Sequence, residues 1–203
     1  MIDKTRIDLA CGQNKREGFI GVDIVSAPGV DIVHDLNVYP WPFEDNSVDE
    51  INCSHYIEHI KHSDTLTDVK EILHTSSSFK EFKEKTLELS HQQDGMIKFM
   101  DEIYRILKVG GKAILTAPYV THTRAYGDPT HTRYIHDMSF YYYNKEWRDT
   151  NKLDHYGIKS NFDMKFSYYI DESLLLKSEE VRNELFTTHW NSIKDIIANL
   201  VKI

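Results

Sequence analysis

Two short apolar runs near the N-terminus each end in residues that can bind a small molecule. Residues 6–12 (RIDLACG) predict a strand that stops at Gly12, and residues 19–23 (FIGVD) predict a strand that stops at Asp23. A glycine turn lets a ligand approach the backbone closely, and an acid that ends the next strand can accept hydrogen bonds from two ribose hydroxyls. This pair predicts a site for a nucleoside-containing cofactor.

The spacing of these residues separates two kinds of nucleoside cofactor. A dinucleotide site has the pattern G-x-G-x-x-G, followed by an acid about 20 residues further on. This turn has one glycine, and Asp23 follows Gly12 by 11 residues. The glycines that place a phosphate on a helix N-terminus are missing, which favours an adenosyl cofactor without phosphates.

The chain around this pair alternates short strands with helical stretches. Further strands are predicted at 31–35, 48–54, 112–117 and 161–169. Helices are predicted over 96–107, stopped by Gly110-Gly111, and over 179–189, whereas 191–203 fits a helix or a final antiparallel strand. The alternation favours an α/β fold with a mostly parallel sheet, whose ligands bind beyond the carboxyl ends of the strands.

Two segments lie outside this alternation. Residues 63–95 are polar and are predicted as a helical insertion, which is either a cover over the site or a solvated excursion. Residues 118–160 are rich in Tyr, His and Asp and are predicted as a long acceptor-side loop with short helices. We expect a single domain over 1–203, because a chain of this length buries about 70% of its unfolded surface.

Six short motifs follow one another between about residues 7 and 120. They are DLACG at 8–12, GVD at 21–23, DIVHDL at 31–36, PFEDNSVD at 42–49, SHYIEHI at 54–60 and EIYRILKVGG at 102–111. Together they resemble the class I S-adenosylmethionine-dependent methyltransferases, in the branch with a short first helix. Ala10 stands where that family has its first glycine, and Val109 stands where it has a proline. The resemblance implies a Rossmann-like fold with a central, mostly parallel seven-stranded sheet and helices on both faces.

The resemblance also implies which residues hold S-adenosylmethionine. They are Asp8, Ala10, Cys11, Gly12, Asp23, Ile24, Asp35, Leu36, Ser54 and His55. In this scheme Asp8 and the 10–12 backbone hold the methionine end, and Asp23 holds the ribose. Asp35 and Leu36 frame the adenine, and the strand end at 53–55 lies beside the sulfonium.

The polar residues after the strand at 112–117 lie where acceptors bind in this family. Three hypotheses compete for His122 and for residues 126–136 (YGDPTHTRYIH). In the first, His122 or His131 is a general base, because an imidazole titrates near neutral pH. In the second, a metal is held by His122, Asp128, His131 and His136, although their spacing matches no zinc signature. In the third, an ion pair between Asp128 and Arg133 pins the loop. The catalytic candidates are His122, His131 and Asp128, and no metal ligand is assigned.

Other chemically active residues are interpreted as structural. The Tyr141-Tyr142-Tyr143 run and Trp147 are expected to divide between a core face and a rim rather than stack on an acceptor. Cys11 is expected to be a small buried hydrophobe rather than a nucleophile. Glu58-His59 is interpreted as a cap or a helix ion pair rather than an acid–base pair.

Composition limits the possible partners and compartment. The net charge of −8 disfavours a nucleic-acid partner, and no apolar run is long enough for a membrane span. The N-terminal residues lack the apolar segment of a secretion signal. Two cysteines without a C-x-x-C pair favour a reducing compartment, so we expect a cytoplasmic monomer or homodimer.

These observations predict an enzyme that transfers a methyl group from S-adenosylmethionine to a small-molecule or saccharide-like acceptor. A hydroxyl acceptor is preferred, because a histidine-rich loop suits proton removal. The alternatives are a catalytically silent S-adenosylmethionine-binding module and a nucleotide-dependent oxidoreductase. The missing phosphate-binding glycines argue against the oxidoreductase.

Overall fold

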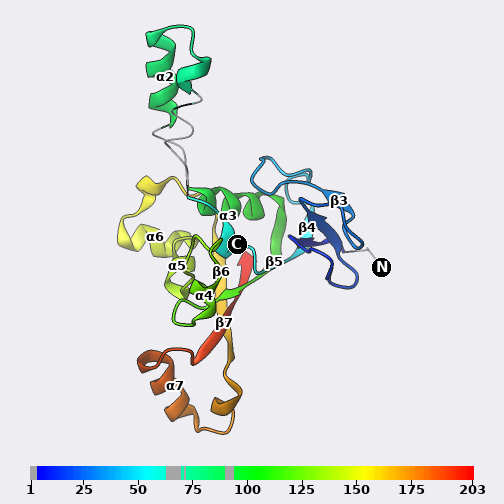
Figure 1. The fold of residues 1–203 in the computed structure, drawn as a ribbon, viewed down its shortest axis with the longest axis vertical. Helices are drawn as coiled ribbons and strands as arrows, with labels where there is room; N and C mark the ends of the chain where they lie inside the picture. The colour runs from blue at the N-terminus through cyan, green and yellow to red at the C-terminus, as the bar shows by residue number, and fades with distance from the viewer. Residues whose placement is uncertain (1–3, 63–69, 71, 90–93) are drawn as a thin grey trace.

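One seven-stranded sheet runs through the protein (Figure 1). The computed structural model describes residues 4–62, 70, 72–89 and 94–203. In these residues the strands are β1 (Arg6–Leu9), β2 (Ile20–Asp23), β3 (Ile32–Val33), β4 (Val48–Ser54), β5 (Leu107–Pro118), β6 (Phe162–Ile170) and β7 (Ile193–Lys202). Their order is β3-β2-β1-β4-β5-β7-β6, with β1 to β5 parallel and β7 antiparallel to both neighbours. The predicted α/β class is confirmed, and residues 191–203 form a strand rather than a helix.

The described helices follow β4, β5 and β6 in the chain. They are η1 (Ile57–His59), α2 (Phe79–Leu89), α3 (Gly95–Ile106), α4 (Arg124–Gly127), α5 (Asp137–Tyr141), α6 (Lys145–Asn151), η2 (Asp154–Tyr156), η3 (Glu172–Leu174) and α7 (Glu179–Thr188). The helices predicted over 96–107 and 179–189 are confirmed as α3 and α7. β5 begins directly after α3 at Leu107, so Gly110-Gly111 lies within the strand and does not end the helix.

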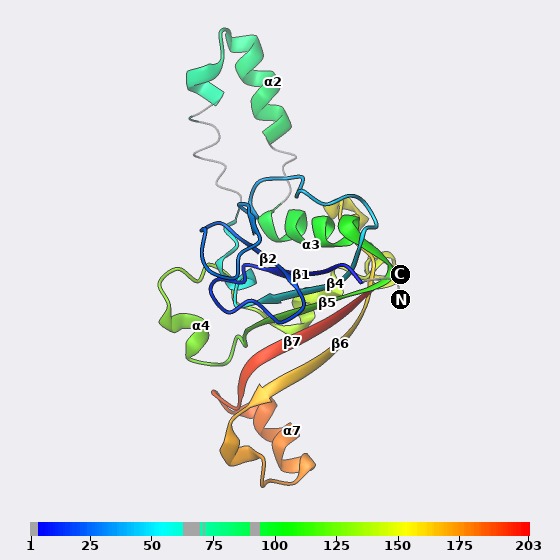
Figure 2. The ribbon, with the colours of Figure 1, turned by 90° about the vertical axis from the view of Figure 1, so that its right-hand side faces the viewer.

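α2 belongs to the segment predicted as an insertion, residues 63–95. It lies apart from the sheet in both ribbon views (Figures 1 and 2). Lys85 forms an ion pair with Glu81 at 2.8 Å along its surface, one turn of helix away. Residues 63–69, 71 and 90–93 lie outside the described residues, and a covering role for this segment stays a prediction.

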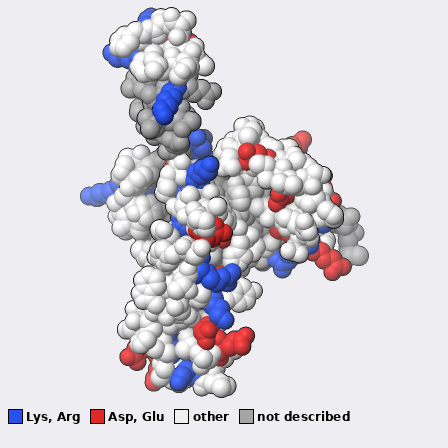
Figure 3. Space-filling model, viewed as in Figure 1, with Lys and Arg blue, Asp and Glu red and all other residues white. Residues whose placement is uncertain are grey.

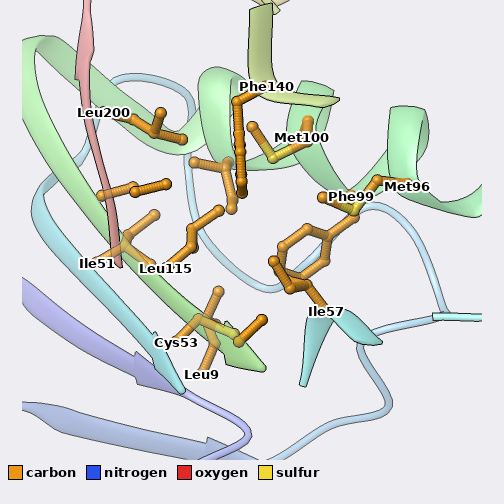
Figure 4. Packing of buried hydrophobic residues seen from close by; sticks show 14 of the residues in the cluster. Leu9, Ile51, Cys53, Ile57, Met96, Phe99, Met100, Leu115, Phe140 and Leu200 are labelled. Atoms are coloured by element: carbon orange, nitrogen blue, oxygen red, sulfur yellow. The ribbon is translucent and has the colours of Figure 1, made fainter. Parts of the chain in front are cut away.

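The core lies between α3 and one face of the sheet. Apolar residues recur along α3 at Met96, Phe99, Met100, Ile103 and Ile106, which places them on one side of the helix. They pack against buried residues of β1, β4, β5 and β7 and against α5, as Figure 4 shows. Each such side chain contributes about 1.5–3 kcal/mol by leaving water, so this layer fixes the sheet beneath the site.

The opposite face of the sheet is different. Residues of β4, β5, β6 and β7 line a cavity of about 830 Å³ there, with Glu50, Lys112, Asn199 and Lys165 among them. The connections at 10–19 and 24–31 contain no helix. The resemblance implies helices on both faces of the sheet. α3 and α5 pack together on the face that holds the core.

Surface charge is mixed on the face that Figure 3 shows. Lys and Arg side chains lie interspersed with Asp and Glu over the helical layer and the strand ends. Among the described residues, none of the helices has the length and apolar character that crossing a membrane requires.

The carboxyl ends of β1, β2, β4 and β5 meet at one edge of the sheet, because these four strands are parallel. β1 and β4 are neighbours in the sheet but not consecutive in the chain, so the strand order reverses between them. Ligands bind at this kind of point in open α/β sheets. The candidate site is therefore built from the turns that leave these four strands.

Candidate active site

The turn after β1 has a tightly defined backbone. Ala10 and Gly12 both have φ of 52°, in the left-handed region. The Cys11 N–H donates to the Val22 carbonyl at 3.2 Å, and the Asn14 N–H donates to the Cys11 carbonyl at 3.1 Å. A Cβ placed on Gly12 would meet no atom within 4 Å, so the space above this turn is open.

Asp23, at the end of β2, contacts this turn directly. Its Oδ2 accepts a hydrogen bond from the Gly12 N–H at 2.9 Å, and its Oδ1 accepts one from the Val25 N–H at 3.1 Å. A carboxylate has about four acceptor positions, so each oxygen keeps one for a further donor. The two residues first singled out in the sequence are thus in contact, beside the 60% exposed Ile24.

Asp8 is buried, and both of its oxygens bind protein groups. Oδ2 accepts from the Arg16 N–H at 2.7 Å, and Oδ1 accepts from the Asn52 amide at 2.7 Å. These bonds tie the loop after β1 to β4. Asp8 therefore positions the turn that follows β1.

Asp35 and Leu36 lie in a rigid loop after β3. The Asp35 Oδ1 accepts from the backbone and side-chain N–H groups of Asn37, both at 2.9 Å. Leu36 is buried, and its carbonyl accepts from the Trp41 indole at 3.1 Å. The buried Trp41 holds this loop against the core next to α3.

The end of β4 turns sharply at His55. Ser54 is exposed, and His55 has φ of 55°, with its N–H donating to the Thr116 carbonyl at 2.8 Å. The His55 Nδ1 lies 3.3 Å from the Glu58 Oε1, and this hydrogen bond raises the pKa of His55.

Neither cysteine is suited to nucleophilic chemistry. Burial raises the pKa of Cys11, and the nearby carboxylates of Asp8 and Asp23 raise it further. Burial also raises the pKa of Cys53. Both thiols therefore stay protonated near neutral pH, in agreement with the prediction of a small buried hydrophobe at Cys11.

A cavity of about 540 Å³ opens beside the ends of β4 and β5. Its lining residues come from η1, from the turn after β5 and from the loop after α4, and they are His55, Glu58, His59, Pro118, Arg124, Gly127, Asp128, Pro129 and His131. Two of the three catalytic candidates, His131 and Asp128, are therefore brought together here. The Asp128 Oδ2 lies 4.0 Å from the His131 Nε2.

His122, the third candidate, is not among these lining residues. Its Nδ1 accepts a hydrogen bond from the Arg124 N–H at 3.1 Å, which places the proton of the neutral ring on Nε2. Burial and the neighbouring Arg124 lower the pKa of His122. A ring in this tautomer has no free lone pair for a substrate proton, so the geometry favours His131 over His122 as a base.

The two other hypotheses for this loop do not match the contacts. Arg133 pairs with Asp94 at 2.8 Å rather than with Asp128, whose Oδ1 instead accepts from the Thr130 N–H and hydroxyl. Asp128 thus closes an Asx turn, and these hydrogen bonds lower its pKa. The predicted metal set is not assembled either, because the Nδ1 of His136 caps α5.

Glu58, His59 and Arg124 line the cavity but were not selected from the sequence. The expected Glu58–His59 ion pair is absent from the described contacts, since Glu58 bonds to His55 and His59 to Thr130. Tyr143 is buried whereas Tyr141 and Tyr142 lie against Trp147, as expected for a division between core and rim. A sequence signal did exist for Glu58, His59 and the partner of Glu58, His55, in the motif SHYIEHI, but not for Thr130 or Arg124.

Two solved structures are similar to this chain over nearly all of its length. One is an S-adenosylmethionine-dependent methyltransferase from Archaeoglobus fulgidus, with 20% identity, a TM-score of 0.58, and coverage of 98% of this chain and 86% of that one. The other is an S-adenosylmethionine-dependent methyltransferase from Mesorhizobium loti, with 10% identity, a TM-score of 0.51, and coverage of 98% and 91%. No protein-family model matches the sequence, and no curated protein does. With the strand order and the single antiparallel strand, these likenesses show that the chain has the Rossmann-like fold of the class I methyltransferases.

Proposed function

We propose that this protein binds S-adenosylmethionine at the carboxyl edge of β1, β2 and β4 and transfers its methyl group to a hydroxyl of a small-molecule or saccharide-like acceptor. The contact between Gly12 and Asp23 carries the proposal. It joins the open turn after β1 to a carboxylate that has spare acceptor positions. This turn leaves the strand beside which the strand order reverses, between β1 and β4. A ribose with two adjacent hydroxyls suits that carboxylate, and no phosphate-binding glycine pattern is present.

The residues around the turn fit the rest of such a cofactor. The negative charge of the Asp8 carboxylate suits the positive ammonium group at the methionine end of the cofactor. Hydrogen bonds from the Arg16 N–H and the Asn52 amide hold this carboxylate in place. The exposed side chain of Ile24 offers apolar surface to an adenine, whereas Leu36 is buried and supports the loop that follows β3. The cofactor supplies an activated methyl group on a sulfonium, so the protein has to provide position rather than activation of the donor.

The acceptor's place is the 540 Å³ cavity beside His55, on the side of β4 away from β1. Holding two reactants in line can supply roughly 7–11 kcal/mol of a barrier. A hydroxyl acceptor must also lose a proton, and a positioned base typically contributes a factor of about 10²–10⁴. His131 is suited to this role, because its Nδ1 donates to the Ala125 carbonyl and leaves Nε2 as a proton acceptor.

Calorimetric titration with S-adenosylhomocysteine, with NAD as a control, tests the cofactor assignment. We expect micromolar binding of S-adenosylhomocysteine alone. Asp23→Ala removes charged hydrogen bonds worth about 1.5–3 kcal/mol, which corresponds to roughly a 10- to 150-fold weaker affinity. Asp49→Ala is the matched control, because Asp49 also accepts a backbone N–H, from Thr5 at 2.9 Å, at the opposite end of the strands.

Equal affinities of the two variants would refute the ribose assignment, and binding of NAD alone would favour the oxidoreductase. Transfer of labelled methyl to a panel of sugars and other hydroxyl compounds then tests catalysis. Binding of S-adenosylhomocysteine without transfer to any acceptor would favour the silent binding module.

A further inference from the structure

Three potential metal ligands meet in the cavity that we assign to the acceptor. Glu58 and His59 belong to η1, and His131 belongs to the loop that follows α4. One ligand atom from each of these side chains lies within 4.8 Å of the other two. The rings of His59 and His131 are in edge contact, with centroids 4.7 Å apart.

The hydrogen bonds of both histidines leave a lone pair on the same ring atom. The His131 Nδ1 lies 3.1 Å from the Ala125 carbonyl, which can only accept, so Nδ1 carries the proton. The His59 Nδ1 lies 3.0 Å from the Thr130 hydroxyl, which donates its own proton to Asp128 at 2.6 Å. Nδ1 of His59 is therefore a donor as well, and Nε2 is the free acceptor in both rings.

This is the arrangement that protein ligands of metals adopt. A ligating histidine usually donates its second N–H to a carbonyl or a carboxylate, which fixes its tautomer and its ring orientation. Here the Ala125 carbonyl serves His131, and the Thr130–Asp128 pair serves His59. In each ring the hydrogen bond at Nδ1 therefore leaves Nε2 available to a metal ion.

The third ligand is a buried carboxylate with an unused oxygen. Glu58 is 2% exposed, and its Oε1 contacts His55. Its Oε2 has no hydrogen-bond partner among the described residues. An unsatisfied carboxylate oxygen in a protein interior is unfavourable, so this atom needs a cation or a donor that the described part of the chain does not supply.

The two ligand-bearing segments are bonded to each other. The Glu58 carbonyl accepts from the N–H groups of Thr132 and Arg133 at 2.9 and 3.1 Å. The Thr132 hydroxyl donates to the Ile60 carbonyl at 2.9 Å, and Arg133 pairs with Asp94 at the start of α3. The cluster is therefore held by the framework of the domain, with its ligand atoms within 4.8 Å of one another.

We propose that Glu58, His59 and His131 bind one divalent first-row transition-metal ion. Two imidazoles and one carboxylate suit such ions, and this set leaves coordination positions open. The open positions face the acceptor cavity, where an alkoxide or a pair of adjacent hydroxyls is the class of ligand that fits them. This last step rests on the proposed function, because a metal-bound hydroxyl loses its proton more readily and becomes a better methyl acceptor. With the metal bound, the His131 Nε2 is a ligand, so the metal takes the place of the general base and the hydroxyl proton passes to water.

Titration of the purified full chain with Co²⁺, after treatment with EDTA, tests the site without any turnover. We expect one Co²⁺ per chain and a visible spectrum of nitrogen and oxygen ligation. Glu58→Gln and His131→Gln preserve shape and should each weaken Co²⁺ binding by at least about tenfold. His155→Gln, which removes a surface imidazole from η2, is the matched control and should bind as the wild type does.

Thr130→Val leaves all three ligands in place and tests the support of His59. We expect a weakening of about 10- to 100-fold and a shifted Co²⁺ spectrum, as is usual when a partner of a ligand is removed. Thr187→Val, in α7, is its control. Circular dichroism establishes that each variant is folded, and a rise in Tm with added Zn²⁺ should occur in the wild type and be lost in Glu58→Gln.

Co²⁺ binding no stronger in the wild type than in Glu58→Gln and His131→Gln would overturn the proposal. S-adenosylhomocysteine binding, measured on the same EDTA-treated sample, separates this result from failure of the proposed function. Retained S-adenosylhomocysteine binding without Co²⁺ binding removes the metal site and leaves the cofactor assignment intact. Co²⁺ binding without S-adenosylhomocysteine binding supports the metal site and refutes the cofactor assignment.

Discussion

Replacement of Ala10 by glycine should be more favourable for stability than replacement by glycine of an alanine whose φ is negative. Ala10 has φ of 52°, a conformation that costs an alanine roughly 1–2 kcal/mol and costs glycine nothing. Two effects oppose this gain. Glycine has a more flexible unfolded chain, worth about 0.4–1 kcal/mol, and a half-buried methyl group is lost. The net gain from Ala10→Gly alone is therefore small.

A matched change separates the strain from the opposing effects. Ala27 is also a half-buried loop alanine, but its φ is not positive, so Ala27→Gly carries the opposing terms without the relief. The Ala10→Gly variant should have a free energy of unfolding about 1–2 kcal/mol higher than that of the Ala27→Gly variant. Thermal unfolding measures this as roughly 2–4 °C per kcal/mol for a chain of this size. If the two variants are equally stable, the turn is not strained and the backbone assignment at Ala10 is wrong.

Three further predictions concern the framework of the site, and urea unfolding measures each. Lys202→Met should lower the free energy of unfolding by about 2–4 kcal/mol. The buried ammonium donates to Asn46 and to the carbonyls of Tyr104 and Leu107, and the variant leaves these acceptors unpaired. A loss below about 1 kcal/mol would contradict this expectation. Phe99→Ala should cost about 3–5 kcal/mol, since Phe99 is fully buried against Trp41, and a small loss would mean that the core collapses around the gap. Asp94→Asn keeps the cap of α3 but loses the ion pair with Arg133. Burial raises the pKa of Asp94, but the hydrogen bond from Arg133 outweighs it together with the bond from the Met96 N–H, so the pKa is lowered overall. A depressed carboxyl pKa stabilises the fold only while the group is ionised, so the deficit of Asp94→Asn, about 1 kcal/mol near pH 7, should narrow as the pH falls below about 4. A deficit that does not change with pH would exclude the ion pair as its cause.

The contact between the turns that we assign to the cofactor could be predicted from the sequence because its signals are local. Each strand that leads to it is a short apolar run, and each run ends in the residue that matters, Gly12 or Asp23. Parallel pairing then brings the carboxyl ends together without any further information. The contact between the Gly12 N–H and the Asp23 carboxylate is a direct consequence of that geometry.

The acceptor side could not be predicted in the same way, because it depends on contacts between distant segments. His59 and His131 are brought together by backbone hydrogen bonds from Thr132 and Arg133 to Glu58, and no local periodicity encodes them. The position of His122 outside the lining of the cavity has a local cause of a different kind. The chain bends there so that the imidazole accepts the Arg124 N–H, which a residue type alone does not reveal.

The placement of the helices shows the same difference between what local sequence signals predict and what depends on contacts between distant segments. The resemblance of the motifs predicts the strands, their order and the fold class. That residues 10–19 and 24–31 contain no helix, and that α5 packs beside α3, required the structure.

In the proposed reaction, one short segment aligns the donor with the acceptor. His55 directly follows β4 and lies between the residues assigned to the cofactor and the acceptor cavity. Glu58 lies three residues later in that cavity, and its carboxylate bonds to the His55 imidazole. The N–H of His55 is fixed to β5 and the carbonyl of Glu58 to the loop at 132–133, so neither end can move alone. Methyl transfer requires the reacting atoms to lie about 3–3.5 Å apart and in line, and a displacement near 1 Å can cost a factor of about 10² in rate. A rigid turn between two sites is therefore what this chemistry needs, and residues 55–58 form such a turn.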